Sequence, residues 1–225
     1  MYLDRLSFFE QLDPRIAVVP QPPAQSAGSR RRGSNRSLVE FRAIAPGYRD
    51  RDLPAELADA VEEACRARSD RTTLGHAAYT VFAELIDNIF EHSETQVDGY
   101  AALQVYRGGR DGGDVLVTVS DSGHGIIGTI RPALKDSSLQ RLSDPELIVH
   151  MFNEGLSRHG DERGCGLHQC AEHALRYRAR LRLPTSGLEL VPGDGRYDVP
   201  NVAYIQPDLP LLYGTHIAFE FRLDG

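Results

Sequence analysis

The stretch VSDSGHGIIG, Val119–Gly128, decides between two folds, because its last six residues match the G-x-G-x-x-G fingerprint of dinucleotide-binding proteins. A Rossmann unit needs these glycines to open a helix after a parallel strand, with an acidic residue about 20 positions further on. Here the preceding strand is predicted to be one arm of a hairpin, and Pro132 follows closely, where it opposes a helix. The surrounding sequence therefore disfavours a Rossmann site for NAD.

Asp121 lies between the predicted strand and the glycines, and a Rossmann site gives it no role. A carboxylate can accept a hydrogen bond from an exocyclic amine such as that of adenine. The glycines that follow it let a backbone approach a ligand closely. Taken alone, the Asp-Ser-Gly order is equally consistent with an aspartate that closes a turn.

A long helix is predicted over residues 72–92, because apolar residues recur there three and four positions apart. Glu84, Asn88 and His92 are spaced by four, so they share one face and interrupt or border the apolar stripe. Glutamate can deprotonate a water, and the asparagine oxygen is a hard ligand suited to magnesium. This face is either a polar seam turned toward a ligand or a solvated stripe with local hydrogen bonds.

Residues 153–167, NEGLSRHGDERGCGL, form a glycine-rich segment before a helix predicted over 167–176. Free amides at the start of a helix favour anions such as phosphate, and Gly164 and Gly166 allow a close approach. The alternative is an ordinary glycine-rich connection.

The spacing of Cys165, His168, Cys170 and His173 is also compatible with a zinc motif. On one short helix, however, these side chains fan over more than half of the circumference. Four tetrahedral ligands cannot converge from that spread, so we do not expect a zinc site here.

The composition is that of an ordinary globular protein, with 225 residues of which 41% are hydrophobic and 25% charged. The formal net charge of -7 argues against a general nucleic-acid binder. Lys135 is the only lysine and follows no Walker-type glycine loop, which excludes a P-loop. The N-terminus has no signal-peptide pattern and no stretch is long and apolar enough for a membrane span, so we expect a cytoplasmic protein.

The order of predicted elements indicates an α+β fold with helices on one face of a mostly antiparallel sheet. Residues 1–37 are predicted to be an extension with an Arg-, Pro- and Ser-rich linker, and 38–225 a single domain. Helices are expected at 53–68, 72–92, 145–153 and 167–176, and a short amphipathic one at about 6–12. Strands are expected at 38–44, 99–107, 114–121, 179–184, 188–191 and 215–223.

Four segments in this order resemble the motifs of the GHKL superfamily of ATP-binding domains, which includes DNA gyrase B and sensor histidine kinases. FAELIDNIFEHS (82–93) resembles the N-box, DSGHGI (121–126) the G1 box and GLSRHGDERGCGL (155–167) the G2 box. YGTHIAFEF (213–221) resembles the final strand. The resemblance implies the Bergerat fold, a two-layer α/β sandwich with a mixed, mostly antiparallel sheet.

For the reacting end of the nucleotide, the resemblance implies ATP and Mg²⁺ as cofactors. Glu84 would be the base that activates water or a phosphoacceptor, and Asn88 would hold the magnesium. The backbone amides of Gly164, Gly166 and Leu167 would bind the phosphates.

For the adenine end, the resemblance implies that Asp121 binds the exocyclic amine. Gly123 and Gly125 would lie beside it in the cofactor site, and Thr215 would support the adenine side. Residues 127–159 would form the ATP lid.

The sequence departs from the family pattern at Ile89, where a small residue is usual, and at His168, where sensor kinases often carry glycine. No histidine precedes His76, so the phosphoacceptor helix of a sensor kinase is not expected. Residues 192–212 form an insertion without an assigned role. We therefore expect a regulatory protein kinase or small ATPase acting with a protein partner or as a homodimer. The alternative is a non-catalytic nucleotide sensor.

Overall fold

A single antiparallel sheet is the central element of the computed structural model, which describes residues 4, 6–12, 14–22, 24, 38–92, 95–108, 112–155, 166–183, 188–199 and 213–224. Within these residues the strand order is β1-β2-β3-β7-β4-β5-β6, and every pairing is antiparallel. The strands are β1 (Leu38–Ile44), β2 (Gly99–Arg107), β3 (Gly113–Ser120), β4 (Arg180–Leu183), β5 (Leu188–Pro192), β6 (Tyr197–Asp198) and β7 (His216–Arg222).

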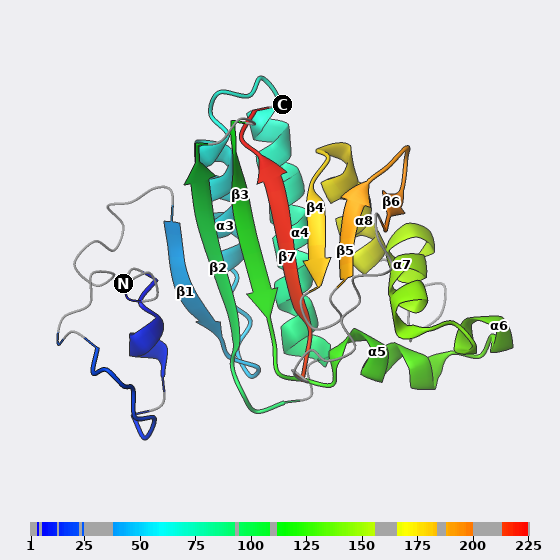
Figure 1. Ribbon diagram of the computed structural model, residues 1–225, viewed down its shortest axis with the longest axis horizontal. Coiled ribbons are helices and arrows are strands. Elements are labelled where there is room, and N and C mark those ends of the chain that lie inside the picture. The colour runs from blue at the N-terminus through cyan, green and yellow to red at the C-terminus, as the bar shows by residue number, and fades with distance from the viewer. Residues whose placement is uncertain are drawn as a thin grey trace.

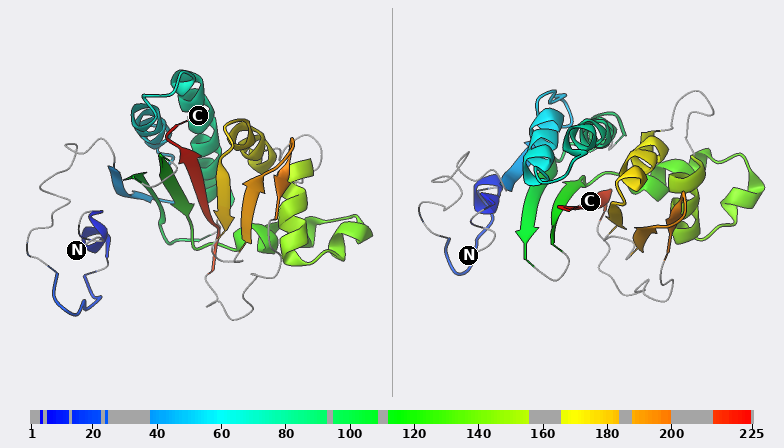
Figure 2. Two further views of the ribbon diagram at one scale, coloured as in Figure 1. Left: turned by 45° about the horizontal axis from the view of Figure 1, so that its top comes forward. Right: turned by 90° about the horizontal axis from the view of Figure 1, so that it is seen from above.

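Helices cover one face of this sheet and one of its edges (Figures 1 and 2). The covering layer consists of α3 (Leu53–Ala64), α4 (Arg71–His92) and α8 (Gly166–Arg176). Beside the β6 edge lies α7 (Asp144–Glu154). The chain reaches it from the lower end of the sheet in Figure 1 through α5 (Gly125–Ile130), the 3-10 turn η2 (Arg131–Ala133) and α6 (Ser137–Gln140). The α+β sandwich with helices on one face is therefore confirmed.

The core lies between the sheet and the helical layer. Strand β3 shows why, because its alternating sequence turns Val115, Val117 and Val119 toward the helices, where each is at most 4% exposed. Helix α4 contributes Phe82 and Ile86, which are both buried. Each such side chain stabilises the fold by about 1.5–3 kcal/mol relative to an exposed position.

Most elements lie where the patterning predicted them. The strand expected at 38–44 is β1, and the helix expected at 72–92 is α4. The helix expected at 53–68 ends earlier, at Ala64, and its last predicted turn becomes the connection to α4.

The expectation that Pro132 opposes a helix after the glycines is wrong. Helix α5 begins at Gly125 and ends at Ile130, two residues before the proline. Pro132 lies at the start of η2, a position where its missing N–H costs no hydrogen bond. A Rossmann unit is nevertheless excluded, because β3 pairs antiparallel with both of its neighbours, β2 and β7.

The N-terminal segment contacts the edge strand β1. The short helix expected at about 6–12 is the 3-10 helix η1 (Phe8–Gln11). The backbone N–H of Phe41 donates to the Leu6 carbonyl at 3.0 Å. The Phe8 and Phe41 rings meet edge to face, as do Phe41 and Tyr100. These contacts protect part of an otherwise open sheet edge.

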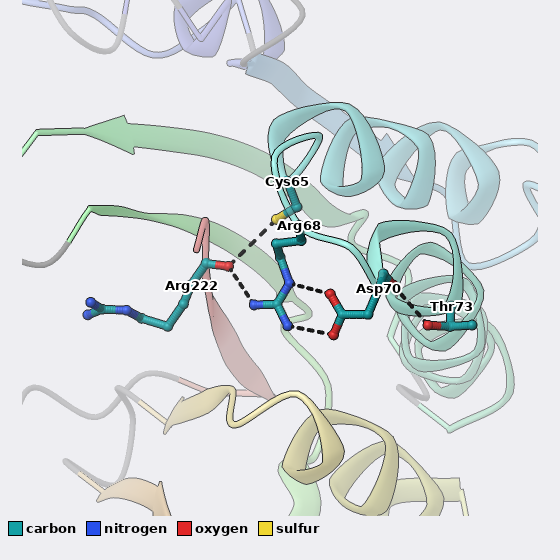
Figure 3. Close-up of polar contacts among 5 residues, drawn as sticks. All are labelled: Cys65, Arg68, Asp70, Thr73 and Arg222. Carbon is teal, nitrogen blue, oxygen red and sulfur yellow. Dashed lines mark hydrogen bonds and ion pairs between the residues drawn. The ribbon is translucent and has the colours of Figure 1, made fainter. Parts of the chain in front are cut away.

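The turn between α3 and α4 is joined to the end of β7 by Arg68 (Figure 3). The guanidinium donates twice to Asp70, at 2.8 Å each, and once to the Arg222 carbonyl at 3.2 Å. The thiol of Cys65 approaches the same carbonyl at 3.7 Å, and burial raises its pKa to about 11, so it stays protonated. One side chain thus connects the helical layer to the sheet.

Replacing Arg68 with methionine is expected to lower the free energy of unfolding by about 1.5–3 kcal/mol, because hydrogen bonds to charged groups are lost at a side chain that is 7% exposed. Urea unfolding at neutral pH measures this loss. The matched control is Arg66→Met, since the Arg66 side chain is 66% exposed and should contribute within about 0.5 kcal/mol. Equal effects of the two substitutions would contradict the role of Arg68.

The same contact makes a prediction for pH. The hydrogen bonds from Arg68 lower the pKa of Asp70, so its stabilising contribution is present above the ordinary carboxyl pKa. That contribution is lost as the pH falls through the lowered pKa of the folded state. The difference in stability between the Arg68→Met variant and the parent should therefore shrink at acidic pH.

Candidate functional site

The motif-bearing segments meet at one end of the sheet, the lower end in Figure 1. Strand β3 ends there and β7 begins there, while the second half of α4 descends behind them. The glycine-led helix α5 follows directly from β3 at the same end. The topology thus gathers three of the four segments that the sequence singled out.

Asp121 and Thr215 are neighbours just beyond the paired ends of β3 and β7. Ser120 is opposite His216 in the β3–β7 register, and the next backbone N–H, that of Asp121, donates to the Thr215 carbonyl at 2.8 Å. Asp121 is 7% exposed, and its carboxylate Oδ1 accepts the N–H of Gly123 at 2.7 Å. The turn-closing role and the ligand-binding role are therefore compatible, because the carboxylate has a second oxygen.

Two glycines allow the backbones to converge at this corner. Gly214 has a φ of +101°, and a Cβ there would lie 2.0 Å from the Asp121 carbonyl oxygen. Gly125 has a φ of +73°, and its Cβ would lie 2.9 Å from the Gly214 carbonyl oxygen. Any other residue at these two positions would push the segment after β3 away from the start of β7. Gly125, which was expected in the cofactor site, thus lies at this corner together with Gly214, which was not predicted as a site residue.

Glu84 lies against the first residue of α8. A Cβ added to Gly166 would be 2.4 Å from Glu84 Oε2, so the carboxylate occupies the space beside this glycine. Leu167 follows in the first turn of α8, half-buried against the core. The candidate base of the N-box and the glycine-led helix of the G2 box are therefore in direct contact. Local sequence patterns contain no signal for that contact.

A buried thiol also lies near Glu84. Cys170 lies one turn into α8, and its Sγ is 3.6 Å from the Val81 carbonyl oxygen. Burial raises the pKa of the Cys170 thiol, and the nearby charge of Glu84 raises it further. The thiol is therefore protonated and acts as a small core residue.

Asn88 lies one turn beyond Glu84 on α4 and is half-buried. Its neighbour Ile89 is 2% exposed and turns toward the sheet, where a Cβ on Gly99 would meet it at 2.9 Å. The absence of a side chain at Gly99 makes room for this larger residue. The departure from the family pattern at Ile89 is thus accommodated by the sheet.

An ion pair that the sequence did not reveal holds α4 just before Asn88. The Arg49 Nε donates to Asp87 Oδ1 at 2.7 Å, and its Nη2 donates to Oδ2. Arg49 lies in the connection between β1 and α3, so this two-bond contact joins that connection to the polar face of α4.

The described residues contain no group of three or more His, Cys, Asp or Glu side chains arranged to hold a metal. Cys170 approaches the Val81 carbonyl, whereas His168 approaches the Phe152 carbonyl, so their side chains serve different contacts. Gly164 and Cys165, the side chain of His92, residues 156–159 of the predicted lid and residues 200–212 of the insertion lie outside the description. Where the chain is described, no helix has both the length and the apolar character required to cross a bilayer.

The site combines a carboxylate at a strand end, a polar face on α4 and the helix α8, which begins at a glycine. These features lie against an antiparallel sheet with helices on one face, which is the arrangement of a nucleotide-binding domain of the GHKL type. The chain belongs to the family of histidine kinase-, DNA gyrase B- and HSP90-like ATPases, whose model matches residues 74–224. This confirms the resemblance seen in the four motifs, and family membership implies that the domain binds ATP. Comparisons with curated proteins and with solved structures gave no significant match.

Proposed function

We propose that this domain binds ATP with Mg²⁺ and uses the γ-phosphate, as a regulatory protein kinase or a small ATPase. The observation that carries the proposal is the position of Glu84 Oε2 beside Gly166. A carboxylate able to accept a proton then lies next to the helix start whose amides suit phosphate. A domain that only bound nucleotide would gain nothing from a carboxylate at this point, since it repels the phosphates.

The adenine end of the proposed site is the corner formed by Asp121 and Thr215. The free oxygen of the Asp121 carboxylate can accept the exocyclic amine of adenine in a nearly dry environment, where a charge-assisted hydrogen bond is strong. Gly123 and Gly125 follow it in the segment after β3, and Gly125 lets this segment approach Gly214 closely. The phosphates would then extend toward Gly166 and Leu167, with Gly164 completing the set of amides.

The protein ligands available here suit a magnesium ion that is held chiefly by the phosphates of the nucleotide. Asn88 offers one hard amide oxygen, and no carboxylate cluster accompanies it among the described residues. Magnesium is commonly held by few protein ligands together with phosphate oxygens and water. When bound, the ion would neutralise phosphate charge, and Asn88 would orient it.

The two catalytic outcomes differ in the acceptor of the phosphoryl group. Glu84 can deprotonate either a water or a hydroxyl of a partner protein, and its geometry is the same for both. In the alternative, nucleotide binding without turnover would act on a protein partner or on the association of two chains.

Calorimetric titration with a non-hydrolysable ATP analogue and magnesium tests the proposal, with NADH titrated in parallel. We expect binding of the ATP analogue and none of NADH. Phosphate release and phosphoryl transfer from ATP labelled at the γ-position then separate an ATPase from a kinase. Binding without either product would leave the sensor alternative, and no binding would refute the proposed function.

A further inference from the structure

His168, the residue that departs from the family pattern in the first turn of α8, contacts the end of another helix. Its Nδ1 lies 3.0 Å from the Phe152 carbonyl oxygen, in the last turn of α7. A carbonyl can only accept, so Nδ1 carries the proton and donates. The carbonyls of a last helical turn have no partner within their helix, so this bond satisfies a group that otherwise needs water.

The backbone at the end of α7 also packs against the His168 side chain. Gly155 ends α7 with a φ of +75°, and a Cβ there would lie 3.4 Å from both Cβ and Cγ of His168. The imidazole therefore packs over the end of α7 while it hydrogen bonds to it. Its other nitrogen, Nε2, is 3.7 Å from Glu172 one turn further along α8.

Helix α7 is held on its other side by strand β6. The Asn153 amide donates to the Tyr197 carbonyl at 2.9 Å, and its oxygen accepts the Tyr197 N–H at 2.8 Å. Tyr197 is 1% exposed, and its hydroxyl donates to the Ala179 carbonyl at 2.8 Å. Tyr197 of the insertion thus joins the last turn of α7 to β6, while His168 joins the same turn to α8.

We propose that His168 is a positioning residue that couples the phosphate-binding start of α8 to α7. This inference rests on the proposed function, since it assumes that Gly166 and Leu167 bind the phosphates of ATP. These two residues immediately precede His168, so a phosphate that fixes the first turn of α8 also fixes the imidazole. The hydrogen bond to Phe152 then transmits the occupancy of the phosphate site to α7.

A pair of amide substitutions separates this coupling from a merely structural role. In His168→Asn the amide nitrogen is attached to Cγ, as Nδ1 is, and can still donate to the Phe152 carbonyl. In His168→Gln the nitrogen lies one bond further out, nearer the place of Nε2, and misses that carbonyl. The control is Glu172→Gln, which alters the other contact of the ring at a side chain that is 65% exposed.

The readout is hydrogen exchange of the α7 amides with and without the non-hydrolysable ATP analogue, together with its Kd. We expect ATP-dependent slowing of exchange in the parent, His168→Asn and Glu172→Gln. In His168→Gln this slowing should be lost and the Kd raised about fivefold to tenfold, the effect of one hydrogen bond. The melting temperatures without nucleotide show whether His168→Gln and His168→Asn are equally folded.

Two results would overturn the inference while leaving the proposed function intact. One is a parent protein that binds the ATP analogue without any change in α7 exchange. The other is a His168→Gln variant whose α7 responds to nucleotide as fully as that of the parent. A parent that does not bind the analogue at all would instead refute the proposed function, and the coupling with it.

Discussion

Asp121→Asn should weaken ATP binding by about 10- to 100-fold, which corresponds to the loss of a charge-assisted hydrogen bond. Asparagine keeps a side-chain oxygen for the Gly123 N–H, so the turn after β3 is preserved. Its other atom becomes an amide N–H₂, which faces the adenine amine as a second donor. Calorimetry with the non-hydrolysable analogue measures the change in Kd, and thermal unfolding measures the stability.

The control for this substitution is Asp59→Asn, which removes the same charge from an exposed position on α3. We expect its ATP affinity to equal that of the parent. A large loss of stability in Asp121→Asn without nucleotide would show that the carboxylate mainly closes the turn. An unchanged Kd would remove Asp121 from the adenine site.

The contrast between Asp121 and Gly214 shows what sequence patterns reveal about this site. Asp121 was identified because a carboxylate at the end of an alternating strand, followed by glycines, is a local pattern. Gly214 is equally close to the corner, but its role depends on the pairing of β3 with β7, which are far apart in the sequence. Local patterning predicts each strand, whereas the register between distant strands decides which backbones touch.

The difference between local patterns and contacts between distant segments also explains which other features could be predicted. The spacing of Glu84 and Asn88 placed both on one helix face, but their contact with α8 depends on packing between two helices. The bonds between Asn153 and Tyr197 join a helix end to a two-residue strand in an insertion, and no periodicity marks either residue. The prediction for Pro132 was wrong because it treated the proline as a helix breaker, although α5 is short enough to end before it.

Glu84→Gln is expected to lower turnover of ATP by about 10²–10⁴-fold, the usual contribution of a general base, while the Kd for the ATP analogue stays within a few-fold. Glutamine has nearly the same shape and fits the space beside Gly166, but its amide cannot take a proton at neutral pH. Because one negative charge near the phosphates is also removed, any change in Kd should be toward tighter binding. Phosphate release and phosphoryl transfer under saturating ATP measure the loss.

The Glu84→Gln experiment is the sharpest test of catalysis because it distinguishes a general base from a residue that only shapes the pocket. A base that touches the attacking water or hydroxyl affects kcat, whereas a residue that only shapes the pocket affects Kd. Glu172→Gln on α8 provides the control, because it replaces an exposed carboxylate one turn beyond His168 and should leave both constants unchanged. Equal turnover by Glu84→Gln and the parent would place the base elsewhere. Turnover at background level in the parent itself would favour the sensor, in which the Glu84 carboxylate takes up no proton.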